Sequence, residues 1–230
     1  ERLFIFQTKA WICNSYSSKR TLIKYCGVPE NKIFSVHNGI NISNVNKDFR
    51  QKENIILTLS NFAQRKGIIE YLSVIEIVVR THKNIRFILA GRDDMNGLVQ
   101  EEIRNKNLEN FVETPGFIEN TEKLLKTSKI MVLPSILPEG CPTSILEGMS
   151  WGLPIICYNI VGIDELVIKN KTGYIVSLYN KKEMADMIIK LLNNPNILKE
   201  FSVNANKIIL ENFTLNEMLR KHRNIFNLSN

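Results

Sequence analysis

Residues 134–149 read PSILPEGCPTSILEGM and join a predicted strand to a predicted helix. The apolar run Ile130 to Leu133 comes directly before it and predicts a buried strand. A loop interrupted by prolines follows, with Glu139 in it, and a helical pattern that contains Glu147 begins near Thr143. A strand that leads into a free helix N-terminus is where α/β sheets bind anions, and carboxylates accept hydrogen bonds from hydroxyls. The stretch therefore predicts a site for a phosphorylated, hydroxyl-rich ligand.

The composition is that of an ordinary globular protein. The chain has 230 residues, of which 44% are hydrophobic and 23% charged, so it can build a large core. The formal net charge of +7 suits an anionic partner such as a nucleotide, a nucleic acid or an acidic phospholipid surface. Because the basic residues are dispersed and no RNA-binding motif accompanies them, we expect no nucleic-acid partner. Basic residues near the C-terminus would allow peripheral contact with a membrane.

The cysteines and histidines do not indicate a metal site. The four cysteines have neither zinc-site nor disulfide-framework spacing, and the three histidines lie far apart in the sequence. A reducing compartment fits, so we expect a cytoplasmic location, with the cytoplasmic face of the membrane as the place of any membrane contact. The sequence begins Glu1-Arg2-Leu3-Phe4, without an initiator Met or a signal peptide, and looks like a cut made inside a longer protein.

Strands and helices alternate from Asn54 onwards. This pattern predicts a Rossmann-like α/β fold, a parallel sheet with helices on both faces. The expected strands are 55–59, 85–90, 111–112, 130–133, 154–158 and 174–177, and the longer helices are 68–81, 98–105, 181–193, 196–212 and 215–226. Residues 41–53 are polar and without periodicity. We therefore predict a partial Rossmann fragment at 1–40, a linker at 41–53 and the main domain at 54–230.

Several residues at strand ends could bind a phosphorylated ligand. Lys66, preceded by Arg65, opens the helix after the first strand of the main domain and could hold a phosphate. Gly91 follows a strand directly and would allow close backbone approach, although a plain turn predicts the same residue. Two glutamates could also be the acid and base of a glycosidase, but Glu139 and Glu147 lie on one loop and helix, and nothing nearby suggests a sugar-distorting cleft.

The motifs together resemble a known enzyme family. The block Glu139-Gly140-x-Pro142-x4-Glu147-Gly148-Met149 resembles the E-x7-E block of retaining GT-B glycosyltransferases of family 4, or glycosyl transferases group 1. Five further segments resemble other blocks of that family in the family's order: Lys66-Gly67, Phe87 to Gly91, Pro115-Gly116-Phe117, Gly162 to Tyr174, and the linker motif Val36 to Ile40. Each motif is weak alone, but their common order is specific.

The resemblance implies a function for the chain. It implies retaining transfer of a sugar, of hexosyltransferase type, from a nucleotide-diphosphate donor to a saccharide, glycolipid or glycoprotein acceptor, as in polysaccharide biosynthesis. By position, Glu147 would bind the ribose, while Glu139 would hold the donor sugar and Lys66 would neutralise the leaving diphosphate. The catalytic residues implied are thus Glu139 and Lys66. No metal or other cofactor is implied.

The resemblance also implies the rest of the donor site. The backbone after Glu139 would hold sugar and diphosphate oxygens, and the segment Phe117-Ile118 would meet the base. The implied donor-binding residues are Asn61, Arg65, Lys66, Gly91, Phe117, Ile118, Glu139, Gly140, Cys141, Pro142, Thr143, Ser144 and Glu147.

The chain departs from the family pattern in three places. Asn61 stands where the family commonly has an arginine, and Arg65 would have to compensate. His37 and Asn41 stand where the linker motif commonly has Pro and Asp. Most of the acceptor domain has no counterpart, so we expect this chain alone to be inactive or weakly active. The alternative is a non-catalytic nucleotide-sugar-binding module or an accessory subunit that needs a partner chain.

Overall fold

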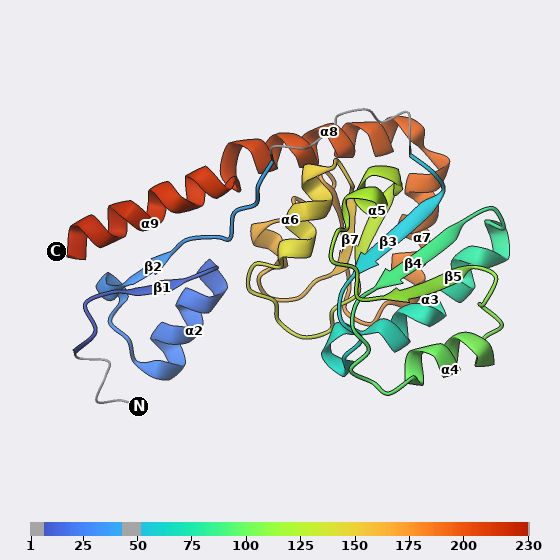
Figure 1. Ribbon diagram of the computed structural model, residues 1–230, viewed down its shortest axis with the longest axis horizontal. Helices are drawn as coiled ribbons and strands as arrows, with labels where there is room; N and C mark the ends of the chain where they lie inside the picture. Colours follow the sequence, from blue (N-terminus) through green and yellow to red (C-terminus); the bar gives the residue numbers. More distant parts are fainter. Residues whose placement is uncertain (1–6, 43–51, 230) are drawn as a thin grey trace.

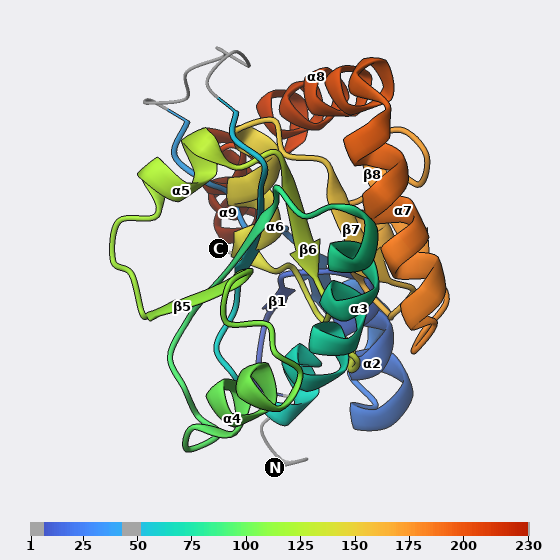
Figure 2. The ribbon, with the colours of Figure 1, turned by 90° about the vertical axis from the view of Figure 1, so that its right-hand side faces the viewer.

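The computed structural model describes residues 7–42 and 52–229. Its main feature is a six-stranded parallel sheet in the order β5-β4-β3-β6-β7-β8, with helices on both faces (Figures 1 and 2). The strands are β3 Ile55–Leu59, β4 Arg86–Ala90, β5 Val112–Gly116, β6 Ile130–Leu133, β7 Ile155–Tyr158 and β8 Gly173–Val176. This order is that of a doubly wound Rossmann-like sheet, so the predicted fold class is confirmed.

The helices lie close to their predicted positions. They are α2 Tyr16–Cys26, α3 Ile68–Thr81, α4 Leu98–Asn105, α5 Glu122–Thr127, α6 Thr143–Ser150, α7 Lys181–Asn193, α8 Pro195–Asn212 and α9 Leu215–Ser229, with 3-10 turns η1 Glu30–Lys32, η3 Gln64–Lys66 and η4 Ile163–Glu165. The α8 helix begins one residue earlier than predicted, at Pro195, because proline fits the first helical position, where no N–H is needed.

The predicted strand at residues 111–112 was too short. The structure extends β5 to Gly116, with Ala90 of β4 opposite Gly116 after a shift in register. Pro115 can lie in this strand because β5 is at the edge of the sheet, where a missing N–H breaks no ladder. Four residues beyond the predicted strand, Glu113 to Gly116, therefore belong to β5, and Phe117 follows directly at the carboxyl edge.

The core lies where the sequence has continuous apolar strands. Every residue of β3 and β6 is buried, as expected for central strands of a parallel sheet covered on both faces. Figure 2 shows α3 and α7 on one face of the sheet and α5 and α6 on the other. The α3 helix buries a continuous apolar stripe that includes Tyr71, Leu72 and Ile75, each 0% exposed. This packing fixes the helix N-termini at the carboxyl edge of the sheet.

A small unit precedes the sheet. We call residues 7–42 the N-terminal unit, in which β1 Trp11–Cys13 and β2 Ile33–Ser35 pair in parallel and α2 connects them. Ser15 caps α2, since its side chain accepts a hydrogen bond from the Ser18 N–H. Most of the predicted linker, residues 43–51, lies outside the described residues.

The C-terminal helix returns to the N-terminal unit. The Ile40 N–H donates to the Phe213 carbonyl at 3.0 Å, and the Leu215 N–H donates to the Ile40 carbonyl at 2.9 Å. Figure 1 shows α9 running from this junction away from the large sheet and over the N-terminal unit. Residues 215–229, which the sequence grouped with the main domain, therefore extend beyond the six-stranded sheet.

Candidate functional site

The candidate site lies where the order of the strands reverses. The chain adds β4 and β5 on one side of β3 and then places β6, β7 and β8 on the other side. In such sheets the crevice at the carboxyl ends of the strands is the usual ligand site. The loop after β3 (residues 60–67) and the loop after β6 (residues 134–142) border this crevice. The predicted site residues all lie at this edge of the sheet or on the helix that follows it.

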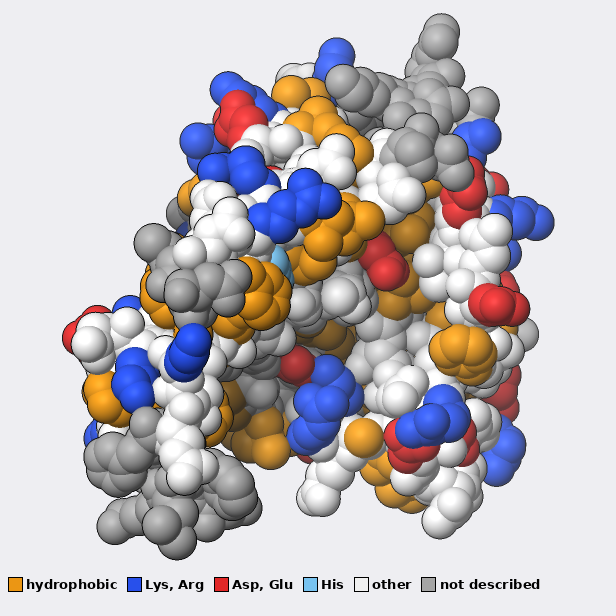
Figure 3. Space-filling view, turned by 60° about the vertical axis from the view of Figure 1, so that its left-hand side comes forward, with side chains coloured by type: hydrophobic (Ala, Val, Ile, Leu, Met, Phe, Trp, Pro, Cys, Tyr) orange, Lys and Arg blue, Asp and Glu red, His pale blue; other side chains and the backbone are white. Residues whose placement is uncertain are grey.

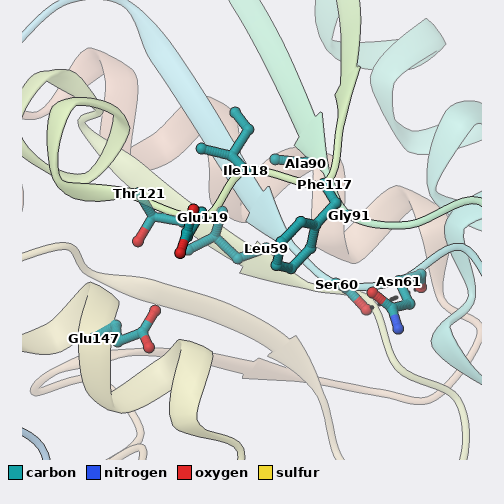
Figure 4. Close-up of a pocket in the computed structure, with 10 residues that line it drawn as sticks. All are labelled: Leu59, Ser60, Asn61, Ala90, Gly91, Phe117, Ile118, Glu119, Thr121 and Glu147. Atoms are coloured by element: carbon teal, nitrogen blue, oxygen red, sulfur yellow. Dashed lines mark hydrogen bonds between the residues drawn. The ribbon is translucent and has the colours of Figure 1, made fainter.

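A cavity of about 300 Å³ opens at this edge (Figure 4). Its lining contains Leu59, Ser60, Asn61, Ala90, Gly91, Phe117, Ile118, Glu119, Thr121 and Glu147. Five of these residues, namely Asn61, Gly91, Phe117, Ile118 and Glu147, were predicted from the sequence. Figure 4 shows the Glu147 carboxylate, on α6, facing across the cavity toward the residues from the ends of β3, β4 and β5. The space-filling view shows a hollow on this side of the molecule (Figure 3).

Glu147 is the unusual residue of the cavity. Its side chain is half-buried, and it has no hydrogen-bond or ion-pair partner among residues 7–42 and 52–229. Burial raises its pKa above the ordinary value of 4.5. A half-buried carboxylate that lacks a partner is suited to accept hydrogen bonds from ligand hydroxyls.

Glu139 and Lys66 form an ion pair between the two loops. Lys66 Nζ contacts Oε1 of Glu139, and the Ser135 hydroxyl donates to the same oxygen at 2.8 Å. The side chains of Glu139 and Lys66 are 10% and 13% exposed, so this pair is largely shielded from water. Arg65 is 53% exposed and its Nη1 lies 3.5 Å from Oε1 of Glu139, a peripheral contact. The structure thus brings together the two residues predicted to be catalytic.

Backbone contacts fix the relative position of these loops. The Ile136 N–H donates to the Arg65 carbonyl at 3.0 Å. Gly67 has φ of 63°, and a Cβ there would lie 2.2 Å from the Pro134 carbonyl oxygen. Only glycine permits both this backbone conformation and this close approach. The glycine after Lys66 therefore holds the loop after β3 against the loop after β6.

The N-terminus of α6 lacks a capping side chain. Its N-cap residue is Pro142, and no side chain bonds the first turn. The first N–H groups of a helix have no acceptor within the helix, so those of Thr143 and Ser144 can serve a ligand. Cys141 is 4% exposed, and burial raises the pKa of its thiol to about 11. The buried Cys141 thiol therefore stays protonated at neutral pH.

Gly91 and Asn61 also have structural roles. A Cβ on Gly91 would lie 2.0 Å from the Ser60 carbonyl oxygen. Glycine is therefore needed at position 91 because the ends of β3 and β4 approach closely there. Oδ1 of Asn61 accepts a hydrogen bond from the Arg92 N–H at 3.2 Å. The turn interpretation of Gly91 is thus supported by the geometry, while the residue still lines the cavity.

Sequence reasoning missed several residues of the site. Ser60, Glu119 and Thr121 line the cavity although none was singled out. Their position just after strand ends is a signal that could have found them. His37, which the sequence marked only as a departure from the linker motif, forms a hydrogen bond with Glu165 in the structure. No sequence pattern pairs two residues so far apart.

The described residues contain neither a cluster of potential metal ligands nor a helix that could span a membrane. Among residues 7–42 and 52–229, no three His, Cys, Asp or Glu side chains are grouped as metal ligands would be. Over the same residues, none of the helices has both the length and the apolar character needed to cross a bilayer.

Comparisons with curated proteins place the chain among glycosyltransferases. It is 31% identical over 196 residues to poly(ribitol-phosphate) alpha-N-acetylglucosaminyltransferase of Staphylococcus aureus (strain COL), with 85% of this chain and 39% of that protein covered. It is 28% identical over 217 residues to the capsular polysaccharide biosynthesis glycosyltransferase CapH of Staphylococcus aureus, with coverage of 93% and 59%. The chain thus spans 39% and 59% of the lengths of these two relatives.

Comparisons with solved structures agree with the fold. A mutant of S. aureus TarM in complex with fondaparinux, alpha-GlcNAc-glycerol and UDP superposes with a TM-score of 0.88 at 28% identity, covering 98% of this chain and 46% of TarM. The pneumococcal O-GlcNAc transferase GtfA, in complex with UDP and GlcNAc, superposes with a TM-score of 0.87 over 99% of this chain and 46% of its own. At 18% identity, this second match shows the fold alone.

The family can be stated from these matches together with the site. The sheet matches that of GT-B glycosyltransferases, and three of the predicted motifs contribute Gly91, Phe117 and Glu147 to one cavity. The family described as "Glycosyl transferases group 1" matches residues 41–208, most of the chain. The chain therefore belongs to the glycosyl transferases group 1 family.

Proposed function

We propose that this chain binds the nucleotide-diphosphate sugar donor of a glycosyltransferase and supplies the donor-binding half of that enzyme. The whole protein would transfer the sugar to a saccharide, glycolipid or glycoprotein acceptor. We further propose that it belongs to family 4, is of hexosyltransferase type and retains the anomeric configuration. The resemblance of the Glu139 to Met149 block supports these finer assignments.

The cavity and its border suggest how the donor would lie. In this proposal Glu147 accepts hydrogen bonds from the ribose hydroxyls, while the backbone at Phe117 and Ile118 meets the base. Phe117 is 73% exposed beside the cavity, so a base can reach this segment. Glu139 binds hydroxyls of the donor sugar. It is already engaged by Lys66 and Ser135, an environment that suits a positioning carboxylate rather than a nucleophile.

The charge of the leaving diphosphate would be met by fixed positive groups. Lys66 lies on the loop after β3 and the uncapped N–H groups of Thr143 and Ser144 begin α6, while Arg65 adds an exposed cation. Such preorganised groups stabilise developing negative charge without reorganisation. We therefore propose transfer that depends on these residues, with no metal or other cofactor.

The proposal depends mainly on the environment of Glu147. Glu147 is half-buried, lacks a partner among the described residues and faces a cavity at the switch point of a Rossmann-like sheet. A purely structural carboxylate would be expected to have a partner, because unpaired burial of charge is costly. A ligand with vicinal hydroxyls removes that cost.

Calorimetric titration of the chain with UDP-, GDP- and ADP-sugars tests the proposal. At least one donor is expected to bind, and Glu147→Ala is expected to weaken its binding by about 1.5–3 kcal/mol, the range for hydrogen bonds to a charged group. Glu101→Ala on α4 is the matched control, because Glu101 is an exposed helical glutamate away from the cavity. Binding unaffected by Glu147→Ala would remove the ribose assignment, and no binding of any of the three donors would overturn the proposal.

The acceptor side needs a separate test. We propose that the chain alone transfers sugar slowly or not at all, and that a longer form with an acceptor-binding domain is required. Equal transferase rates for the two forms would contradict this. Peripheral binding to an anionic membrane through the basic C-terminal region is also proposed. Absence of the chain from sedimented vesicles that contain phosphatidylserine would exclude it.

A further inference from the structure

A hydrogen-bonded seam joins the N-terminal unit to the sheet beside the candidate site. Glu165, at the end of η4, accepts hydrogen bonds from the N–H groups of Tyr16 and Ser17 at 2.8 and 2.7 Å. Nε2 of His37 lies 2.8 Å from the same carboxylate. The side chains of His37 and Glu165 are 13% and 9% exposed. One buried carboxylate thus holds both the start of α2 and the segment that follows β2.

Aromatic rings fix the imidazole in this position. The His37 ring lies edge-on to the rings of Tyr16 and Phe213, with centroid distances of 5.2 and 5.5 Å. Burial by itself raises the pKa of Glu165, but the hydrogen bonds from His37 and from the N–H groups of Tyr16 and Ser17 outweigh it and lower that pKa below 4.5. The Glu165 carboxylate therefore stays ionised at neutral pH and keeps its partners.

The seam continues into the loop after β6, residues 134–142. Nδ2 of Asn38, the residue after His37, donates to the Cys141 carbonyl at 2.7 Å. On the other side of this loop, the Glu139 N–H donates to the Val161 carbonyl at 3.1 Å, and a Cβ on Gly162 would lie 1.9 Å from the Glu139 carbonyl oxygen. Gly162 is the residue from which η4 starts. The loop is therefore held between two segments that His37 and Glu165 join.

We propose that His37 and Glu165 are positioning residues of the donor site. By pairing with Glu165, His37 fixes Asn38, and Asn38 in turn fixes the backbone of residues 139–141 next to the first turn of α6. Neither His37 nor Glu165 lines the cavity, so their effect on a ligand is indirect. The positioning of the loop stands on geometry alone, and its consequence for donor binding rests on the proposed function.

Hydrogen exchange followed by mass spectrometry tests the positioning in the ligand-free chain. His37→Phe and Glu165→Gln are expected to speed amide exchange in residues 138–145 by about 2- to 30-fold, the range for residues that modulate a site without touching its ligand. His37→Gln retains a donor for Glu165 and is expected to lie between His37→Phe and wild type. Circular dichroism shows whether each variant is folded.

Matched controls lie elsewhere in the fold. His82→Phe removes a histidine whose Nε2 lies 3.0 Å from Oδ1 of Asn193, and Glu76→Gln removes a carboxylate paired with Arg80 and Lys106. Neither is expected to change exchange in residues 138–145. Unchanged exchange there in the folded Glu165→Gln and His37→Phe variants would overturn the proposal.

Asn38 provides a second, milder test of the same connection. Asn38→Ala is expected to speed exchange in residues 138–145 in the wild type but to add little in the Glu165→Gln background, because the two residues act through one connection. Additive effects would contradict the route through Asn38. UDP titration of the same variants is expected to show the affinity falling by a similar factor. If exchange speeds up but the wild type does not bind UDP or any UDP-, GDP- or ADP-sugar, the proposed function fails and the positioning stands.

Discussion

Nζ of Lys66 and Oε1 of Glu139 form an ion pair that joins the loop after β3 to the loop after β6. The two residues are 73 positions apart in the sequence, and they meet at the point where the strand order reverses. In the ligand-free protein the lysine charge is therefore already matched by a carboxylate. A diphosphate would add negative charge to a site in which the positive charges of Lys66, Arg65 and the α6 N-terminus exceed the negative charge of Glu139.

The charge of Lys66 is expected to matter for a diphosphate and not for a nucleoside. Lys66→Met should weaken UDP binding by about 1.5–3 kcal/mol, because a charged hydrogen bond is lost, and should leave uridine binding nearly unchanged. Calorimetric titration with both ligands measures this. Lys129→Met is the control, because Lys129 precedes β6 at the opposite edge of the sheet and bonds Asn54. Equal losses of affinity for UDP and uridine would show that Lys66 does not act on the diphosphate.

The contribution of Arg65 is expected to be smaller. Arg65 is 53% exposed and 3.5 Å from Glu139, and exposed ion pairs are typically worth about 0–1 kcal/mol. Arg65→Gln should therefore weaken UDP binding less than Lys66→Met in the same titration. A loss as large as that of Lys66→Met would instead show that Arg65 replaces the arginine that the family commonly has at the position of Asn61.

The stability of the ligand-free protein is expected to depend on the ionisation of Glu147. Burial raises the pKa of Glu147, so the folded state favours the protonated form, and stability is lost as the pH rises through the folded-state pKa. Glu147→Gln removes this dependence. The variant should melt a few degrees higher than wild type at pH 7 and at nearly the same temperature at pH 4. Scanning calorimetry at both values measures it, and a lower melting temperature at pH 7 would contradict the assignment.

Gly162 is expected to be required both for stability and for the donor loop. Gly162 and Gly97 have φ of 96° and 86°, so alanine at either should cost about 1–2 kcal/mol in backbone strain. Only at Gly162 would the new Cβ meet an atom, the Glu139 carbonyl oxygen at 1.9 Å, whereas nothing lies within 4 Å at Gly97. Gly162→Ala should therefore lower the free energy of unfolding in urea by about 1–3 kcal/mol more than Gly97→Ala.

The same two variants separate stability from binding. Gly162→Ala is expected to weaken UDP binding because it displaces the loop that contains Glu139, while Gly97→Ala should leave UDP affinity unchanged. If both variants lose the same stability and neither loses affinity, the loop tolerates the clash and the argument from Gly162 is wrong.

The fold class could be predicted from the sequence because its signals are local. Apolar runs such as Ile130–Leu133, and Ile55–Leu59 with the single polar residue Thr58, indicate buried parallel strands, and Gly and Pro mark the turns between them. Glu139 and Glu147 could be named as site residues because one loop and one helix contain both. The extent of β5 could not be predicted, because Pro115 reads as a loop residue and only its edge position permits it in a strand.

The order of strands and helices along the chain, the proline-containing turn before α6 and the match to the glycosyl transferases group 1 family all follow from the amino-acid sequence alone. The tertiary structure alone decided which side chains meet. It paired Lys66 with Glu139 and His37 with Glu165, and it returned α9 to the N-terminal unit. The physical reason is one of range: secondary structure and turns follow from neighbours in the chain, whereas ion pairs between distant loops exist only after the sheet has placed those loops at one edge.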